Sequence, residues 1–339
     1  MARRGIGCGG HLIRALISFV IIIVVLAGAF AGVFYGTSPS TFGITKIANI
    51  ELGELADMKF SELWKVLKSL KSPDVTKIID FPITDEMLEQ EHLLLYGDGT
   101  TPGILDEMGI ADKPESLFKE PVVVTTATQM TFNGSTFAVL ANDIIDNIDS
   151  NPEYAFLLEI INLLKDNDSD PAPAEIMQFQ FFNDGGNLSV KIVVSLKIKN
   201  IKDQLPGYLK SLLGDIIYVT VTNGLTLNLD GTLTAAPNTS VIKVNDLSNA
   251  ISKAIISSLI DTTGLTMSQG EAAISLLAPL LSIINNIGHV GTLNNSIPAP
   301  FTVVTPYAIT NELPEYGGTI TLVLHTELCE HLPPVVTEP

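Results

Sequence analysis

The hydrophobic pattern begins with an uninterrupted apolar run, from Ala15 to Tyr35, that contains no charged residue. A bilayer core needs about 20 apolar residues of α-helix, and this run provides that length. We therefore expect a transmembrane helix over 15–35 that anchors the rest of the chain. The alternative is a signal peptide cleaved after Ala31, because Ala29-Phe30-Ala31 matches the small-residue rule. The apolar run continues past that site to Tyr35, which favours an uncleaved anchor.

The next pattern is helical and lies in a membrane-proximal segment, 36–117. Apolar residues at helical spacing are Phe60, Leu63, Trp64, Leu67 and Leu70. The other faces carry Lys59, Glu62, Lys65, Lys68 and Lys71, and Ser72-Pro73 ends the helix. One interpretation is a helix on the outer leaflet, with Trp64 at the interface and Lys65, Lys68 and Lys71 toward lipid headgroups. The other is an ordinary core helix with a solvated lysine face. A second helix is expected from Thr84 to about Leu95.

From residue 121 the chain alternates between strand and helix patterns. The expected strands are 122–132, 177–183, 188–199, 218–222, 225–233, 241–244, 301–304 and 319–326. The expected helices cover 136–148, 152–164, 202–213, 246–260 and 270–287. This composition predicts an α+β ectodomain, 118–328, followed by a Pro-rich tail, 329–339. The order strand, helix, helix, strand, Gly-Gly turn, strand occurs at 121–199 and again at 238–326, so a duplicated β-α-α-β-β unit is one hypothesis.

The cleanest alternation in the chain lies in the strand at 188–199. One face carries Leu188, Val190, Ile192, Val194, Leu196 and Ile198. The other carries Ser189, Lys191, Ser195, Lys197 and Lys199. This period of two predicts an antiparallel sheet that faces water on one side and is covered by amphipathic helices on the other. The apolar side either closes as a plain core or lines a groove for an acyl-chain lipid.

The charge distribution adds a topology. All three arginines, Arg3, Arg4 and Arg14, precede the apolar run, whereas the first acidic residue is Glu51. Positive flanks stay in the cytoplasm, so we expect a single-pass membrane protein with a cytoplasmic tail, 1–14, and an extracytoplasmic C-terminal domain. The formal net charge of −18 argues against a nucleic-acid partner, which requires a basic surface.

Motifs for catalysis or metal binding are weak. The sequence contains none of the patterns GxSxG, HExxH or the P-loop, so we expect no enzymatic activity and no cofactor. Asp166, Asp168 and Asp170 resemble the start of a calcium loop, but Pro171 and Met177 replace its glycine and glutamate, which favours a solvated linker. Alternation along a continued last strand would place His325, Glu327, Cys329 and His331 on one face as metal ligands. Coincidence at a chain end is the simpler interpretation, and we expect no metal.

The layout resembles the tubular lipid-binding (TULIP) superfamily. The resemblance covers about 118–328 and is carried by the long one-sided strands, the amphipathic helices and the two segments GGNLSVKIVVSLKI and GGTITLVLHTEL. It implies a curved antiparallel sheet wrapped around a long helix, with lipid held in an apolar groove. The expected function is then a membrane-anchored lipid-binding or lipid-transfer module, with an acyl-chain lipid as ligand. The alternative is a structural, adhesion or envelope-assembly protein that acts by contact with another envelope protein.

Overall fold

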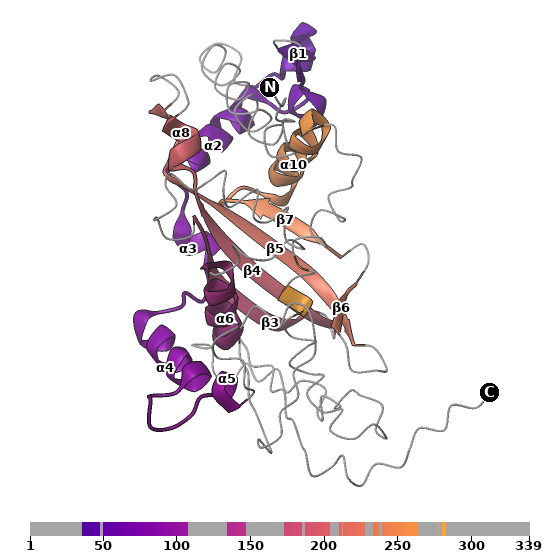
Figure 1. Cartoon of the computed structure of the whole chain (residues 1–339). Helices are drawn as coiled ribbons and strands as arrows, with labels where there is room; N and C mark the ends of the chain where they lie inside the picture. The colour runs from indigo at the N-terminus through magenta and orange to yellow at the C-terminus, as the bar shows by residue number, and fades with distance from the viewer. Residues whose placement is uncertain are drawn as a thin grey trace, which may run out of the picture.

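The computed structural model of the 339-residue chain describes 36–47, 50–107, 134–146, 173–184, 187–203, 210–211, 213–227, 233–236, 239–263, 277 and 280–282. Its first part is helical (Figure 1). The elements are η1 (Pro39–Phe42), β1 (Lys46–Ile47), β2 (Ile50–Glu51), η2 (Gly53–Ala56), α2 (Phe60–Lys71), α3 (Val75–Ile78), α4 (Asp85–Tyr96), α5 (Ile104–Glu107) and α6 (Gly134–Asp146). The two helices expected around Phe60–Leu70 and Thr84–Leu95 are confirmed as α2 and α4.

The second part of the chain builds an antiparallel sheet. Its elements are β3 (Ala174–Asp184), β4 (Asn187–Lys197), α8 (Lys199–Asp203), β5 (Ile216–Leu227), β6 (Leu233–Ala235), β7 (Val241–Val244) and α10 (Asn249–Thr263). Within the described residues the sheet has five strands in the order β3-β4-β5-β6, and β7 also pairs with β5. Asp184 pairs with Asn187, so a two-residue loop joins β3 to β4 as the turn pattern predicted. The protein therefore belongs to the α+β class.

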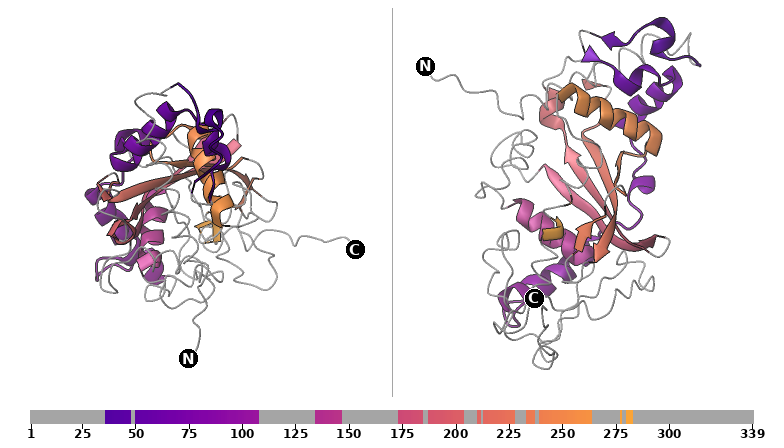
Figure 2. Two further views of the ribbon diagram at one scale, coloured as in Figure 1. Left: turned by 90° about the horizontal axis from the view of Figure 1, so that it is seen from above. Right: turned by 90° about the vertical axis from the view of Figure 1, so that its right-hand side faces the viewer.

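One face of the sheet is an apolar core. Phe179 and Phe181 of β3 lie opposite Ile192 and Val190 of β4, and residues opposite each other in an antiparallel pair share a face. The ring of Phe137 from α6 packs on both phenylalanines, at centroid distances of 5.7 and 5.9 Å. Figures 1 and 2 show α6 and residues 280–282 on the same side of the sheet, where Leu281 is buried. Each fully buried large side chain contributes about 1.5–3 kcal/mol.

The opposite face is more covered than the alternating pattern predicted. Val193 and Tyr218 on this face pack against Ile78 and Ile79 at the end of α3 and form a small buried cluster. The reason is Val193, an apolar residue that interrupts the polar face and gives the α3 segment a surface to cover. Lys191 keeps its ammonium group at the surface through an ion pair with Asp80. The expectation of a face open to water is therefore wrong around Val193.

Two further boundaries differ from the expectations. The strand expected to run to Lys199 ends earlier: β4 ends at Lys197, and Lys199 is the first residue of helix α8. The strand expected at 218–222 continues across Asn223 and Gly224 into 225–227 as one strand, β5, whereas Leu233 begins β6. The Asn223 side chain is buried and accepts a hydrogen bond from the Ser240 hydroxyl, so it is used inside the sheet and does not make a turn.

Several expectations fall on residues outside the described ranges. These are the tail at 1–14, the span at 15–35, the strands at 122–132, 301–304 and 319–326, the helix at 152–164 and the C-terminal segment at 329–339. The proposed duplication depends on these elements and stays a prediction. In the part of the chain that is described, no helix combines the length and the apolar character needed to cross a membrane.

Candidate functional site

Helix α2 is held with one face in the core and one face exposed. Its buried face carries Phe60, Leu63, Val66, Leu67 and Leu70. Trp64 is 46% exposed, and Lys65, Lys68 and Lys71 are exposed around it. The backbone N–H of Lys59 donates to Glu62 Oε2 at 3.0 Å, which satisfies one donor at the start of the helix. The amphipathic helix is thus confirmed, and its four candidate membrane-surface residues lie on the exposed face. Their contact with a membrane stays a prediction.

The turn from β7 to α10 attaches α2 to the sheet. Asn245 has a φ of 49° and is buried. Its side-chain Oδ1 accepts from the Tyr218 N–H at 2.8 Å, and its Nδ2 donates to the Ser69 carbonyl at 2.9 Å. The Gly214 N–H donates to the Leu70 carbonyl at 2.9 Å, which ties the end of α2 to the start of β5. These bonds fix α2 relative to the first turn of α10.

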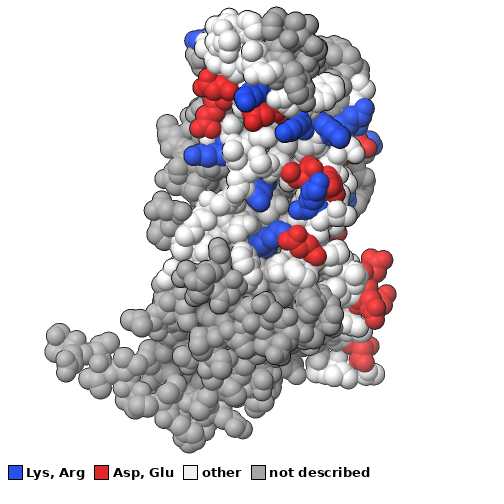
Figure 3. All heavy atoms as spheres, turned by 180° about the vertical axis from the view of Figure 1, so that it is seen from behind, with Lys and Arg blue, Asp and Glu red and all other residues white. Residues whose placement is uncertain are grey.

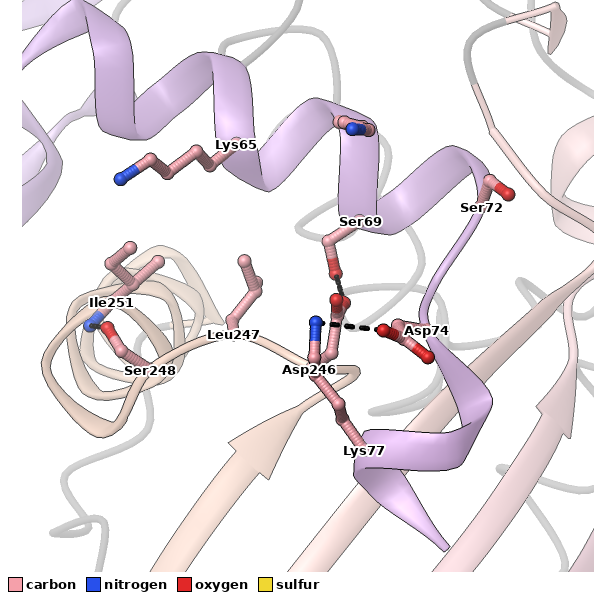
Figure 4. Close-up of a pocket in the computed structure, with 10 residues that line it drawn as sticks. Lys65, Ser69, Ser72, Asp74, Lys77, Asp246, Leu247, Ser248 and Ile251 are labelled. Carbon is pink, nitrogen blue, oxygen red and sulfur yellow. Dashed lines mark hydrogen bonds and ion pairs between the residues drawn. The ribbon is translucent and has the colours of Figure 1, made fainter.

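A pocket of about 380 Å³ lies where α2, α3 and the first turn of α10 meet. Its lining is Lys65, Lys68, Ser69, Ser72, Asp74, Lys77, Asp246, Leu247, Ser248 and Ile251. Figure 4 shows Lys65 at one end, beside Leu247, Ser248 and Ile251, and the two carboxylates with Lys77 at the other end. The volume falls in the range of small-molecule sites.

The charges at the two ends of this pocket differ. Lys77 Nζ lies 2.8 Å from Asp74 Oδ2, and this contact lowers the pKa of the Asp74 carboxyl and raises that of the Lys77 ammonium. Ser69 Oγ donates to Asp246 Oδ1 at 2.6 Å. Lys65 and Lys68 form no ion pair with any described residue. Positive charge without a counter-charge is therefore concentrated on the α2 side.

The charged side chains are unevenly spread over the surface. Figure 3 shows lysines, with some carboxylates among them, in the upper half of the back face. Carboxylates alone gather low on the right in that view, where α4 contributes exposed Asp85, Glu86 and Glu89. On this face the lysines thus gather over the half that contains α2, and an anionic ligand would be attracted there.

The six lipid-facing candidates of the β4 region differ in exposure. Val190 is 0%, Ile192 2% and Ile198 2% exposed, whereas Val194 and Leu196 are partly exposed. The backbone of Leu188 pairs with Asn183 of β3. Val194 lies opposite Val219 of β5, which is also partly exposed. Contact with a lipid stays a prediction for these residues, and it is restricted to the Val194 end of the face in this conformation.

A buried polar network links α4 to α6. Thr136 Oγ1 donates to Glu91 Oε2 at 2.6 Å, and both residues are buried. One turn further along α4, burial, the charge of Asp143 and a hydrogen bond to that carboxylate raise the pKa of Tyr96. Buried carboxylates can act in acid–base catalysis, but Glu91 and Asp143 each contact the other helix, and these two contacts serve to join α4 to α6.

The other chemistry candidates from the sequence are not tested. Asp166, Asp168 and Asp170, and the set His325, Glu327, Cys329 and His331, lie outside the described residues. Among the residues that the structure describes, no three His, Cys, Asp or Glu side chains lie close enough together to hold a metal ion.

Sequence reasoning found Lys65 and Lys68 but missed the residues that complete the pocket. Asp246 and Ser248 stand far from α2 in the sequence, and they reach it only because β7 pairs with β5. A capping pattern at Ser248 was the one available signal, since Ser is a common residue before a helix.

Comparisons with family models, with curated proteins and with solved structures found no match to this chain.

Proposed function

We propose that the chain is a membrane-anchored lipid-binding or lipid-transfer module whose α2 surface rests on the outer leaflet. The observation that carries the proposal is the exposed side of α2, which presents Trp64 together with Lys65, Lys68 and Lys71. Tryptophan prefers the membrane interface, and lysines beside it are attracted to anionic headgroups. The segment 36–59, which has 24 residues, joins the predicted span at 15–35 to α2 and keeps this surface near the bilayer.

A lipid-binding role also needs a place for an acyl chain. The partly exposed Val194, Leu196 and Val219 supply apolar contacts at one end of the sheet. Anchoring raises the effective concentration of the module at its lipid source, which would compensate for a small binding surface. The fully buried Val190 and Ile192 belong to the closed part of the core and serve to hold the sheet in place.

Trp64 provides a direct test of the membrane contact because it is the only tryptophan of the chain. The full chain is reconstituted in vesicles that contain lipids with a quencher on the acyl chain. We expect quenching of Trp64 fluorescence that decreases when Lys65, Lys68 and Lys71 are changed to Gln. Efficient quenching by aqueous acrylamide, with none by the lipid quencher, would contradict the orientation.

A second test measures transfer. The full chain in donor vesicles should accelerate the movement of a fluorescent phospholipid to acceptor vesicles. Val194→Glu should abolish the acceleration, because it places a charge in the apolar strip. Thr222→Glu is the matched control, since Thr222 is partly exposed on the opposite face of the sheet, beside Lys191. Equal rates for both variants, with unchanged circular dichroism, would refute acyl-chain binding at this strip.

One observation favours the alternative, a structural or envelope-assembly protein. Helix α4 exposes Leu93 and Leu94, at 53% and 42%, beside the acidic residues of the same helix. Adjacent exposed leucines are typical of a protein contact surface. Site-specific cross-linking from Leu94 to a single envelope protein in cells, combined with no lipid transfer, would favour this function.

A further inference from the structure

The pocket between α2, α3 and α10 combines unpaired positive charge with an adjacent apolar wall. Asp74 neutralises Lys77, and Asp246 accepts the Ser69 hydroxyl, so both carboxylates already have partners at one end. At the other end, Lys65 lies beside Leu247, Ser248 and Ile251 (Figure 4). Lys65 and Lys68 belong to a chain with a net charge of −18, in which lysines are outnumbered by carboxylates about two to one.

We propose that this pocket binds a phosphoryl group, carried either by a phospholipid headgroup or by a small phosphate ester, between the ammonium groups of Lys65 and Lys68. Lysine ammonium groups bind phosphate oxygens as point charges and supply several hydrogen-bond donors. The hydroxyl of Ser248, an exposed residue at the Lys65 end, adds a neutral donor at the pocket wall. The headgroup form of this proposal rests on the proposed function, whereas the free-ester form does not.

The first turn of α10 supports the same end of the pocket. Ser248 Oγ accepts from the Ile251 N–H at 3.4 Å, so the residue caps a 15-residue helix whose start is partly positive. Asp74 and Asp246 would repel a phosphoryl group that moved to their end. The ligand is therefore confined to the Lys65 end, where the side chains of Leu247 and Ile251 can contact the carbon atoms of an ester or a glycerol backbone. This combination selects an organic phosphate over a simple anion.

The test uses the full chain in uncharged detergent micelles that contain no phospholipid. Isothermal titration calorimetry is performed with inorganic phosphate, glycerol 3-phosphate and phosphatidylglycerol, with diacylglycerol as the lipid that lacks a phosphate. The variant is Lys65→Gln with Lys68→Gln. The matched control, Lys197→Gln with Lys253→Gln, makes the same charge change at two exposed lysines outside the pocket. A second variant, Ser248→Glu, places a carboxylate at the pocket wall.

We expect glycerol 3-phosphate, phosphatidylglycerol or both to bind more tightly than inorganic phosphate. We expect the Lys65/Lys68 variant and Ser248→Glu each to weaken that binding by about tenfold or more. The site is supported if the Lys197/Lys253 control binds the probe as the wild-type chain does and both the Lys65/Lys68 variant and Ser248→Glu bind it more weakly. Binding of phosphatidylglycerol alone identifies a lipid headgroup, and binding of glycerol 3-phosphate as well identifies the shared phosphoryl group. Binding of no probe, or equal weakening in the control, would overturn the proposal. If the phosphoryl proposal is overturned in either of these ways but the wild-type chain still transfers lipid, the proposed function stands. The failures of the two proposals are therefore distinguishable.

Discussion

The side-chain amide of Asn142 on α6 is hydrogen-bonded to both backbone polar groups of Ile176 on β3. Nδ2 donates to the Ile176 carbonyl at 3.1 Å, and the Ile176 N–H donates to Oδ1 at 2.7 Å. In the described part of the sheet, β3 has only β4 as a neighbour, so its other edge would offer free donors and acceptors. An exposed edge is a template for association with another chain. Asn142 thus completes the ladder at the point where the register shifts between Ile176 and Gln178.

We predict that Asn142→Ala destabilises the protein by about 1–3 kcal/mol, because two backbone groups on a largely buried residue lose their partners. Urea unfolding followed by circular dichroism measures the change, and light scattering measures association through the exposed edge. Gln90→Ala is the control, since Gln90 is an exposed amide on α4. A stability equal to that of the control would show that water replaces the Asn142 amide at no cost.

The contact between Thr136 and Glu91 gives a second prediction. Thr136→Val keeps the shape of the side chain but removes the hydroxyl that donates to Glu91 Oε2. We expect a loss of about 1–3 kcal/mol in the free energy of unfolding, because a buried carboxylate loses a donor. Thr136→Ser retains the hydroxyl and should lose less. Equal losses for Val and Ser would assign the effect to packing alone.

Tyr96 predicts a pH dependence in the alkaline range. Burial, the charge of Asp143 and the hydrogen bond to it raise the pKa of Tyr96 above its ordinary value of 10.0 in the folded state. The stabilisation from the protonated phenol is therefore fully present below the unfolded pKa and is lost as the pH rises through the folded one. The wild-type free energy of unfolding should decrease above about pH 10 more steeply than that of Tyr96→Phe. Parallel curves for the two proteins, with the Tyr96→Phe variant folded, would contradict the assignment.

The secondary structure could be predicted where one face of an element is apolar and the other is charged. Helix α2 and the β3–β4 hairpin have such patterns, and the structure confirms both. The sequence pattern predicts two strands in place of β5, because Asn223 and Gly224 are both typical of turns. In the fold, Gly224 admits the close approach of Thr239, whose hydroxyl accepts from the Gly224 N–H at 2.9 Å. A tertiary contact therefore overrode a local preference.

The candidate site could be predicted only in part. The exposed lysines of α2 follow from helical periodicity, which assigns residues to faces of one element. The pocket requires α2 and the β7–α10 turn to meet, and that meeting depends on the pairing of β5 with β7 and on the Asn245 bond to Ser69. No local pattern encodes a contact between residues 176 positions apart. The cover of Val193 by α3 was missed for the same reason.

Asn245 is the residue on which we expect the pocket geometry to depend most. It holds a left-handed φ of 49°, and its side chain joins the Tyr218 N–H to the Ser69 carbonyl, both in buried surroundings. Asn245→Ala should cost about 2–4 kcal/mol, because both groups lose a partner and alanine is strained at this φ.

A series of variants separates the two causes. Asn245→Gly relieves the backbone strain but not the lost hydrogen bonds, so it should recover about 1 kcal/mol relative to Ala. Asn245→Asp keeps an acceptor for Tyr218 and loses the donor for Ser69, so it should weaken the link to α2 selectively. Trp64 fluorescence reports on α2, and its emission should shift in Asn245→Asp before the sheet unfolds in urea. Simultaneous loss of the Trp64 signal and of the far-ultraviolet circular dichroism in all three variants would show that α2 and the sheet unfold as one unit, and that Asn245 does not control the position of the helix separately.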